Sequence, residues 1–298
     1  MSRNRNRIKP SVGEQVFDVV NIIFMLFMIV ITLYPMLYVL FASFSSPRKL
    51  MMHYGPLWHP LDFNLASYKA VFKNPNIWNG YRNTTFIIVV GVAINMALTM
   101  LGGYLLSRKN WMFQKIMSMA IVFTMYFSGG LIPFYLTVRD LRLDNTLWAL
   151  IIPTAISTYN MIIMRTAFAA IPDSLEESAK LDGANHFIIL TKIMIPLVVP
   201  TIAVLILYYG VSHWNSWFNA MIFLRDRSKY PLQLILREIL IQNSLNEMTL
   251  GAGMDDKEMI AETIKYAVIV VSTVPILCLY PFLQKYFVKG VMIGAVKG

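Results

Sequence analysis

The sequence is poor in charged residues and almost free of cysteine. Its 298 residues include one cysteine, and 14% of them are Asp, Glu, Lys or Arg, whereas soluble domains carry about 25%. A single cysteine excludes an internal disulfide and a Cys-X-X-Cys metal or redox site, so Cys278, which lies in an apolar run, is interpreted as a packing residue. The scarcity of charge argues against a water-soluble protein, which needs a charged surface to stay dispersed.

Motifs for catalysis and nucleotide binding are also absent. The chain has no HExxH, no GxSxG, no GxxxxGK[ST] loop and no carboxylate pair or Cys/His set in its apolar segments. Such motifs supply metal ligands, activated nucleophiles or a phosphate cradle. We therefore expect no enzyme, no catalytic or metal-binding residue and no cofactor. Any work that the protein performs then draws its energy from another chain.

What the sequence has instead is six long apolar stretches. Apolar residues make up 57% of the chain, the mean hydropathy is +0.56, and a helix spans a bilayer with about 20 mostly apolar residues. The sequence therefore predicts an all-α polytopic membrane protein with six transmembrane helices. The six stretches are Val16–Phe44, Asn83–Leu106, Ile116–Val138, Thr146–Met164, Pro196–Leu224 and Tyr266–Tyr286.

The distribution of basic residues predicts the orientation. Six crossings put both termini on one side, together with the basic start, the short loop at Arg108 and the basic end of the chain. Lys and Arg accumulate beside cytoplasmic membrane ends, so both termini are expected in the cytoplasm, and the net charge of +10 is attributed to topology rather than to a nucleic-acid partner. The full-length first stretch, without a small-residue cleavage site, predicts an anchor rather than a cleaved signal. The expected parts are an N-terminal tail (1–15), a transmembrane domain (16–288) with an inner loop (171–196) and an outer loop (225–265), and a C-terminal tail (289–298).

Ionisable side chains are scarce in the apolar stretches. Transporters driven by ion gradients usually place such groups inside the bilayer. Here the second, third and fourth stretches have none, and the fifth has only His213. Coupling to an ion gradient is therefore disfavoured, and His213 is interpreted as a hydrogen-bonded or interfacial residue rather than a proton relay.

The inner loop has the pattern of a helix, a turn and a second helix. Pro172 stands near the start, Asp173 or Ser174 can cap the helix, and Gly183 allows the chain to turn before another helix leads into the membrane.

The first of these helices carries charged side chains and one small residue that bear on docking. Glu176, Glu177 and Lys180 are expected to be available to water or to a partner, and the small Ala179 permits close docking of the helix.

This loop resembles the EAA loop of permease subunits of ATP-binding-cassette importers. That pattern is E-A-A, three residues, G, nine residues, I, one residue, L-P, and Glu177-Ser178-Ala179, Gly183 and Ile193-Met194-Ile195-Pro196 stand at its spacings, with Ser for Ala and Ile for Leu. The resemblance extends over essentially the whole chain. It is closest to the carbohydrate branch, of the maltose-importer second-permease type, and within it to permeases for complex or acidic oligosaccharides such as alginate or pectin fragments. Further matching stretches are Asn83-Thr84, Trp214-Asn215-Ser216-Trp217, Tyr230-Pro231-Leu232-Gln233 and the tail from Val288 to Gly298.

The resemblance implies a permease that forms half of the pathway of an ATP-driven, binding-protein-dependent sugar importer in the bacterial inner membrane. Implied partners are a second homologous permease subunit, two ATP-binding-cassette ATPase subunits, an extracellular or periplasmic solute-binding protein, a carbohydrate substrate and membrane lipid, without nucleic acid. Glu177 would pair with a basic residue in a groove of the ATPase. An ion-gradient-driven transporter and a non-transporting membrane scaffold are the alternatives. The residues implied to couple to the ATPase are Glu176, Glu177, Ser178, Ala179, Asp182, Gly183 and Ala184.

Two features are expected on the outer side. Residues Pro231–Gln242 are predicted to form an amphipathic surface helix, and the acidic, glycine-containing stretch Asn243–Glu262 to form a solvated loop that contacts the binding protein. Aromatic and amide side chains near the outer end of the fifth stretch form a candidate sugar path, although each also fits an interfacial aromatic belt. They are Tyr208, Tyr209, Trp214, Asn215, Trp217 and Asn219.

Overall fold

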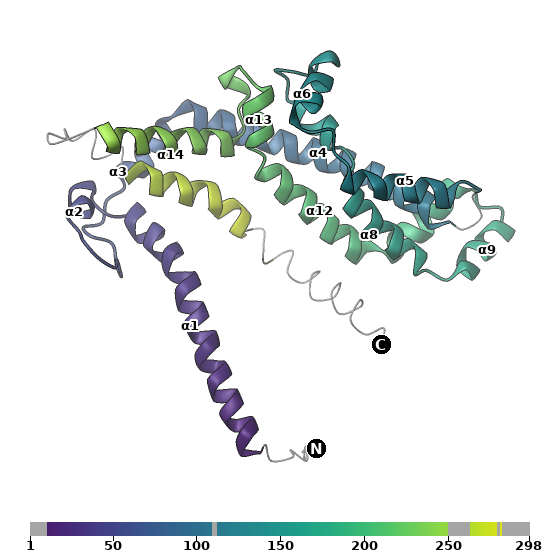
Figure 1. The fold of residues 1–298 in the computed structure, drawn as a ribbon, viewed down its shortest axis with the longest axis horizontal. Helices are drawn as coiled ribbons and strands as arrows, with labels where there is room; N and C mark the ends of the chain where they lie inside the picture. Colours follow the sequence, from purple (N-terminus) through teal and green to yellow (C-terminus); the bar gives the residue numbers. More distant parts are fainter. Residues whose placement is uncertain (1–10, 109–111, 250–262, 279–280, 282–298) are drawn as a thin grey trace. The chain divides into compact units, whose positions relative to one another are not determined.

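A computed structural model describes residues 11–108, 112–249, 263–278 and 281 of the chain. Regular structure in these residues is helical throughout (Figure 1), apart from one isolated bridge between Ser45 and Phe63. The prediction of an all-α protein is therefore confirmed. The helices are α1 (Val12–Ser43), α2 (Pro47–Met51), α3 (Ala66–Lys73), α4 (Pro75–Ser107), α5 (Gln114–Tyr126), α6 (Leu131–Asp140), α7 (Trp148–Ile151), the 3-10 helix η1 (Ile152–Thr154), α8 (Thr158–Ala169), α9 (Asp173–Leu181), α10 (His186–Ile188), the π-helix η2 (Ile189–Met194), α11 (Ile195–Leu197), α12 (Val199–Trp214), α13 (Phe218–Phe223), the 3-10 helix η3 (Arg227–Lys229), α14 (Leu232–Thr249) and Thr263–Cys278.

The chain divides into two units, of which the first contains α1 and α2. Helix α1 begins at a capping box in which the Ser11 hydroxyl accepts from the Glu14 backbone N–H and the Glu14 carboxylate accepts from the Ser11 N–H. Apolar side chains cover its length, and only Ala42 and Ser43, at its end, are buried. A helix that is apolar on all sides and barely covered by its own chain fits lipid or another subunit as its surroundings.

The second unit is built on α4, which packs against α8 and α12. Glycines on α4 allow this close approach, as is common between membrane helices. A Cβ added at Gly103 would lie 2.8 Å from Cγ of Met164 and 3.1 Å from the backbone nitrogen of Arg165 on α8. A Cβ added at Gly91 would lie 2.7 Å from Nε2 of His213 on α12. Any larger residue at these positions would push the helices apart.

A buried polar chain also joins α4, η1 and α12. His213 Nε2 lies 2.7 Å from Asn95 Oδ1, and Asn95 Nδ2 donates to the carbonyl oxygens of Thr154 (2.7 Å) and Ala155 (2.9 Å). These carbonyls belong to the irregular segment before α8, where helical hydrogen bonding is interrupted. Polar groups inside a membrane protein need such partners, because lipid supplies none. The interpretation of His213 as a hydrogen-bonded residue is confirmed.

Two of the six predicted spans form single long helices. Helices α1 and α4 are each long and apolar enough to cross a bilayer. The third stretch is bent by 115° between α5 and α6, and the segment His186–Leu197 is bent by 85° relative to α12. If each bent pair is one span, four spans meet the criterion among the described residues. The fourth stretch is split into α7, η1 and the start of α8, and the sixth is described only as Thr263–Cys278. The count of six therefore stays a prediction.

The loop predicted after the surface helix is shorter than expected. Helix α14 begins at Leu232, close to the predicted start, but it continues to Thr249. The expectation of a loop is therefore wrong for residues 243–249, because α14 continues through this polar stretch without a break. Residues 250–262 of the predicted contact loop lie outside the described residues.

Candidate functional site

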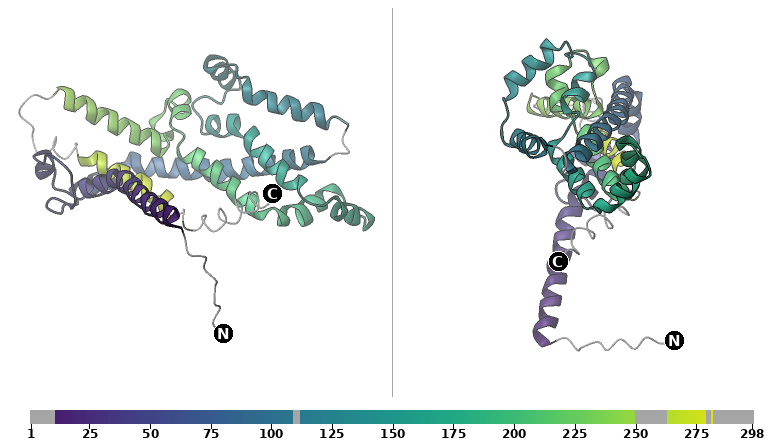
Figure 2. Two further views of the ribbon diagram at one scale, coloured as in Figure 1. Left: turned by 60° about the horizontal axis from the view of Figure 1, so that its bottom comes forward. Right: turned by 90° about the vertical axis from the view of Figure 1, so that its right-hand side faces the viewer.

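Helix α9 is the first helix of the predicted helix-turn-helix. It lies at one end of the second unit, beyond α8 and away from α13 (Figures 1 and 2). Pro172, rather than Asp173 or Ser174, occupies the N-cap position, because Asp173 and Ser174 already lie in the first turn of α9. After the helix, Gly183 has a φ of +81°, in the left-handed region that glycine adopts at low cost. The chain then turns into α10, so the turn at Gly183 is confirmed.

The two faces of α9 have different surroundings. Glu176 and Ala179, three residues apart, are buried, and Ala179 packs in the core formed with α4, α8 and α12. Glu177, Ser178 and Leu181 are exposed, Leu181 to 90% of its surface. The expectation that Glu176 is available to water or a partner is therefore wrong, because Glu176 lies on the inward face. Of the other candidates, Asp182 and Gly183 are exposed and Ala184 is half-buried.

The buried Glu176 carboxylate is held by two cations. Arg108, at the end of α4, pairs through Nη1 with Glu176 Oε2, and Lys180 Nζ lies 2.8 Å from Glu176 Oε1. Arg108 also donates from Nη2 to the carbonyl oxygen of Phe168 (3.2 Å) and from Nε to the Ser107 hydroxyl (3.0 Å). One guanidinium group therefore joins the ends of α4 and α8 to α9.

The environment of Glu176 favours its ionised form. Burial raises the pKa of its carboxyl group, but the hydrogen bonds and charges of Lys180 and Arg108 lower it by more, so the net pKa lies below the ordinary value. The carboxylate is therefore negatively charged at neutral pH, and its pairing with Arg108 is a true ion pair.

Two exposed apolar side chains and the Arg108 pairing were not predicted from the sequence. Leu181 and Phe187 stand exposed on either side of the Gly183 turn. Their apolar character beside the acidic Glu177 and Asp182 was visible in the sequence, but their exposure was not. Arg108 was used only as a topological marker, because no local pattern connects it to a residue so far along the chain.

The six candidate sugar-path residues fall into two groups. Tyr209 and Trp214 are buried. The Tyr209 hydroxyl lies 2.7 Å from Thr99 Oγ1 and accepts from the Ser157 backbone N–H at 3.2 Å, so it is engaged in holding the helices together. Four candidates keep exposed surface, namely Tyr208, Asn215, Trp217 and Asn219, the last of them half-buried.

One guanidinium group contacts an exposed candidate, and two more are held by nearby elements of the second unit. Arg237 of α14 lies over the ring of Trp217 with its Cζ 4.6 Å from the ring centroid. Arg225 donates to the Tyr135 hydroxyl at 3.4 Å, and Arg227 pairs with Glu238 at 2.9 Å. Basic and aromatic side chains therefore meet at this end of the second unit.

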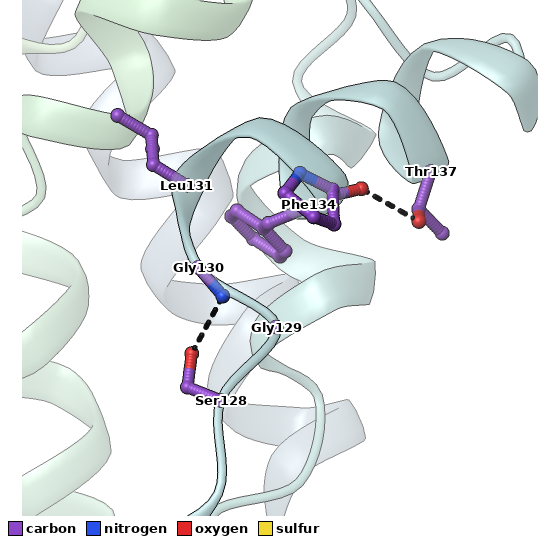
Figure 3. A pocket seen from close by; sticks show the side chains of 7 residues that line it. Ser128, Gly129, Gly130, Leu131, Phe134 and Thr137 are labelled. Atoms are coloured by element: carbon purple, nitrogen blue, oxygen red, sulfur yellow. Dashed lines mark hydrogen bonds between the residues drawn. The ribbon is translucent and has the colours of Figure 1, made fainter.

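A hollow lies at the bend between α5 and α6 (Figure 3). The Ser128 hydroxyl accepts from the Gly130 N–H at 3.2 Å, and Gly130 has a φ of +84°, which suits the sharp change of direction. Thr137 donates to the Pro133 carbonyl oxygen, one turn earlier in α6, at 2.8 Å. None of the residues that line the hollow has an ionisable side chain.

Metal-binding geometry is absent from the part of the chain that the structure describes. No three His, Cys, Asp or Glu side chains are grouped there so that they could hold a metal ion.

Similar proteins are known for nearly the full length of the chain. It is 41% identical over 290 residues to the polygalacturonan/rhamnogalacturonan transport system permease protein YtcP of Bacillus subtilis (strain 168), with 96% of this chain and 99% of that protein covered. It is 40% identical over 284 residues to protein LplC of the same organism, covering 95% and 96% of the two chains.

A solved structure shares both the sequence and the fold. The crystal structure of a bacterial ABC transporter involved in the import of the acidic polysaccharide alginate contains a chain that is 33% identical, with a TM-score of 0.86. The match covers 94% of the present chain and 100% of that chain. No protein-family model matches the sequence.

Proposed function

This chain belongs to the permease subunits of ATP-binding-cassette sugar importers, and on that premise we propose that it imports acidic oligosaccharides and is driven through α9. As such a permease it is a membrane protein of the sugar-transport machinery.

The outward face of α9 carries the proposal for coupling. Burial of Glu176 and Ala179 attaches the helix to the body of the permease and leaves Glu177, Ser178 and Leu181 exposed. An exposed leucine beside a carboxylate suits a partner groove that has an apolar floor and a basic rim. We assign this face to an ATPase subunit, with Glu177 as the charged contact.

The remaining partners follow from the permease being half of a pathway. A second homologous permease subunit supplies the other half, two ATPase subunits bind on the cytoplasmic side, and a solute-binding protein delivers substrate from outside. In this arrangement six spans place both termini and α9 in the cytoplasm. The outer end of the second unit, around η3 and α13, then faces the binding protein.

The class of substrate is proposed from the outer residues together with the similar proteins. Polygalacturonan and alginate, named for two of those proteins, are acidic polysaccharides. Guanidinium groups bind carboxylates in a bidentate manner, and aromatic rings stack on sugar faces. Arg237 over Trp217, with Tyr208 exposed on α12, provides both kinds of group.

Uptake by the purified assembly in proteoliposomes tests the proposal. With ATP and the binding protein present, we expect uptake of a short oligogalacturonate to exceed that of maltotetraose by at least about tenfold. Glu177→Lys should abolish ATP-driven uptake and release the ATPase subunit, whereas Asp140→Lys, the same charge change on an exposed residue of α6, should do neither. Uptake driven by a proton or sodium gradient in the absence of ATP would contradict the proposal.

A further inference from the structure

The exposed face of α9 accounts for contact with a partner. It does not explain how a displacement of α9 by that partner is transmitted to the membrane helices. Apolar packing of Ala179 is non-directional, so it fixes how close α9 lies and not how it is oriented. The charged contacts are directional. Glu176 has both carboxylate oxygens engaged, Oε2 by Arg108 and Oε1 by Lys180.

The two cations around Glu176 differ in what they connect. Lys180 lies one turn further along α9 itself, and 43% of its side chain is exposed, so its pairing stays within the helix and is screened by water. Arg108 belongs to the end of α4, and the side chains of Arg108 and Glu176 are exposed to only 13% and 8%. The link between elements is therefore the desolvated one.

Arg108 is itself held from several directions. Its Nη2 donates to the Phe168 carbonyl oxygen at the end of α8, its Nε donates to Ser107, and its Cζ lies 5.3 Å from the centroid of the Tyr104 ring. A planar guanidinium that is fixed by a carbonyl, a hydroxyl and a ring has little freedom to follow Glu176 on its own. Displacement of α9 must therefore move the ends of α4 and α8 with it or break a buried ion pair.

We propose that the Arg108–Glu176 pair is the internal link through which α9 moves α4 and α8, with Arg108 and Glu176 as positioning residues for transport. The inference rests on the proposed function, because it needs α9 to receive a push from an ATPase. It extends that function by separating two neighbouring glutamates. Glu177 faces the partner, and Glu176 transmits the movement inward.

Its test is the ratio of substrate imported to ATP hydrolysed in proteoliposomes containing the complete assembly. Arg108→Gln and Glu176→Gln should each keep the ATPase subunit bound and hydrolysing ATP, while the transport ratio falls at least about tenfold. The double variant Arg108→Gln/Glu176→Gln should lose no more than either single variant, since both act through one contact. Lys180→Gln, which removes the exposed cation from the same carboxylate, is the matched control and should keep the ratio within about twofold.

A second variant guards against simple loss of folding. Glu176→Asp keeps the charge but is one methylene shorter, so the assembly should purify intact and still show a reduced ratio. Wild-type ratios in the single variants, or losses that multiply in the double variant, would overturn the link while the proposed function stands. A wild-type assembly without ATP-driven uptake would overturn both.

Discussion

Gly183 shows how much a single residue decides at the end of α9. Its φ of +81° lies in the left-handed region, and a Cβ added there would meet no atom within 4 Å. The cost of a side chain is therefore conformational rather than steric. Non-glycine residues pay about 1–2 kcal/mol for this conformation, and asparagine less than most because it adopts it more readily.

Two substitutions at this position separate conformation from size. Gly183→Asn should purify with its ATPase subunit and keep most ATP-driven uptake, whereas Gly183→Val should lose at least about tenfold of it, because a β-branched residue resists a positive φ. The measurement is uptake at equal protein in proteoliposomes. Equal activity of the two variants would show that the turn does not depend on the left-handed conformation.

Glu176 makes a pH prediction at the same scale. The folded pKa of its carboxyl group lies below that of the unfolded chain, about 4.3, so ionisation stabilises the folded state fully above that value and this contribution disappears as the pH falls through the folded pKa. The difference in thermal midpoint between wild type and Glu176→Gln in detergent should stay constant from about pH 8 to 6 and shrink below about pH 4. A difference that changes between pH 8 and 6 would contradict this assignment of charge.

At the scale of the element, α4 is the helix on which the second unit depends. Two glycines of α4 and one of α12 differ in what surrounds them. A Cβ at Gly103 would meet the backbone of α8, one at Gly102 would meet the movable end of Met161, and Gly210 of α12 has nothing within 4 Å of the same position. Backbone cannot move aside as a side chain can. Alanine should therefore be tolerated best at Gly210, less well at Gly102 and least at Gly103.

Alanine scanning of these glycines tests the close packing of α4 and α8. Gly103→Ala should cost about 1–3 kcal/mol through overpacking, and Gly102→Ala less than that. Gly210→Ala should be neutral or stabilising by up to about 1 kcal/mol, because it adds helix propensity without a clash. Thermal midpoints of the purified protein in detergent measure the series. Loss of stability at Gly210 equal to that at Gly103 would mean that packing is not the cause.

At the scale of the whole molecule, the prediction is topological. With Cys278 replaced by serine, Asp140→Cys should react with a membrane-impermeant maleimide in spheroplasts, and Leu181→Cys only in inverted vesicles. Both side chains are well exposed, so reactivity reports the side of the membrane rather than burial. The reverse pattern would contradict the proposed orientation. Labelling of both from one side would mean that the fourth apolar stretch does not cross the membrane.

The sequence predicted the features that depend on neighbouring residues. Apolar length predicted membrane helices, and the long α1 and α4 meet that prediction. Pro172 and Gly183 predicted the start of a short helix and the turn after it. The structure has that helix at Asp173–Leu181 and the turn at Gly183. The breaks in the other stretches were not predicted, because mean hydropathy averages over a window of residues. Such an average does not detect a glycine pair. It also does not detect buried polar side chains, such as His213 and Asn95, that supply hydrogen bonds where the helix is interrupted.

By itself, then, the sequence determined an all-helical membrane permease with a helix-turn-helix between its fourth and fifth apolar stretches. Only the tertiary structure decided which glutamate of that helix faces inward. Glu176 and Glu177 are adjacent in the chain and have the same helix propensity. Glu176 is the buried one, and it pairs with Arg108, which lies 68 residues earlier at the end of α4. Contacts between distant residues of this kind have no local signature, since they depend on how helices pack and not on how each helix forms.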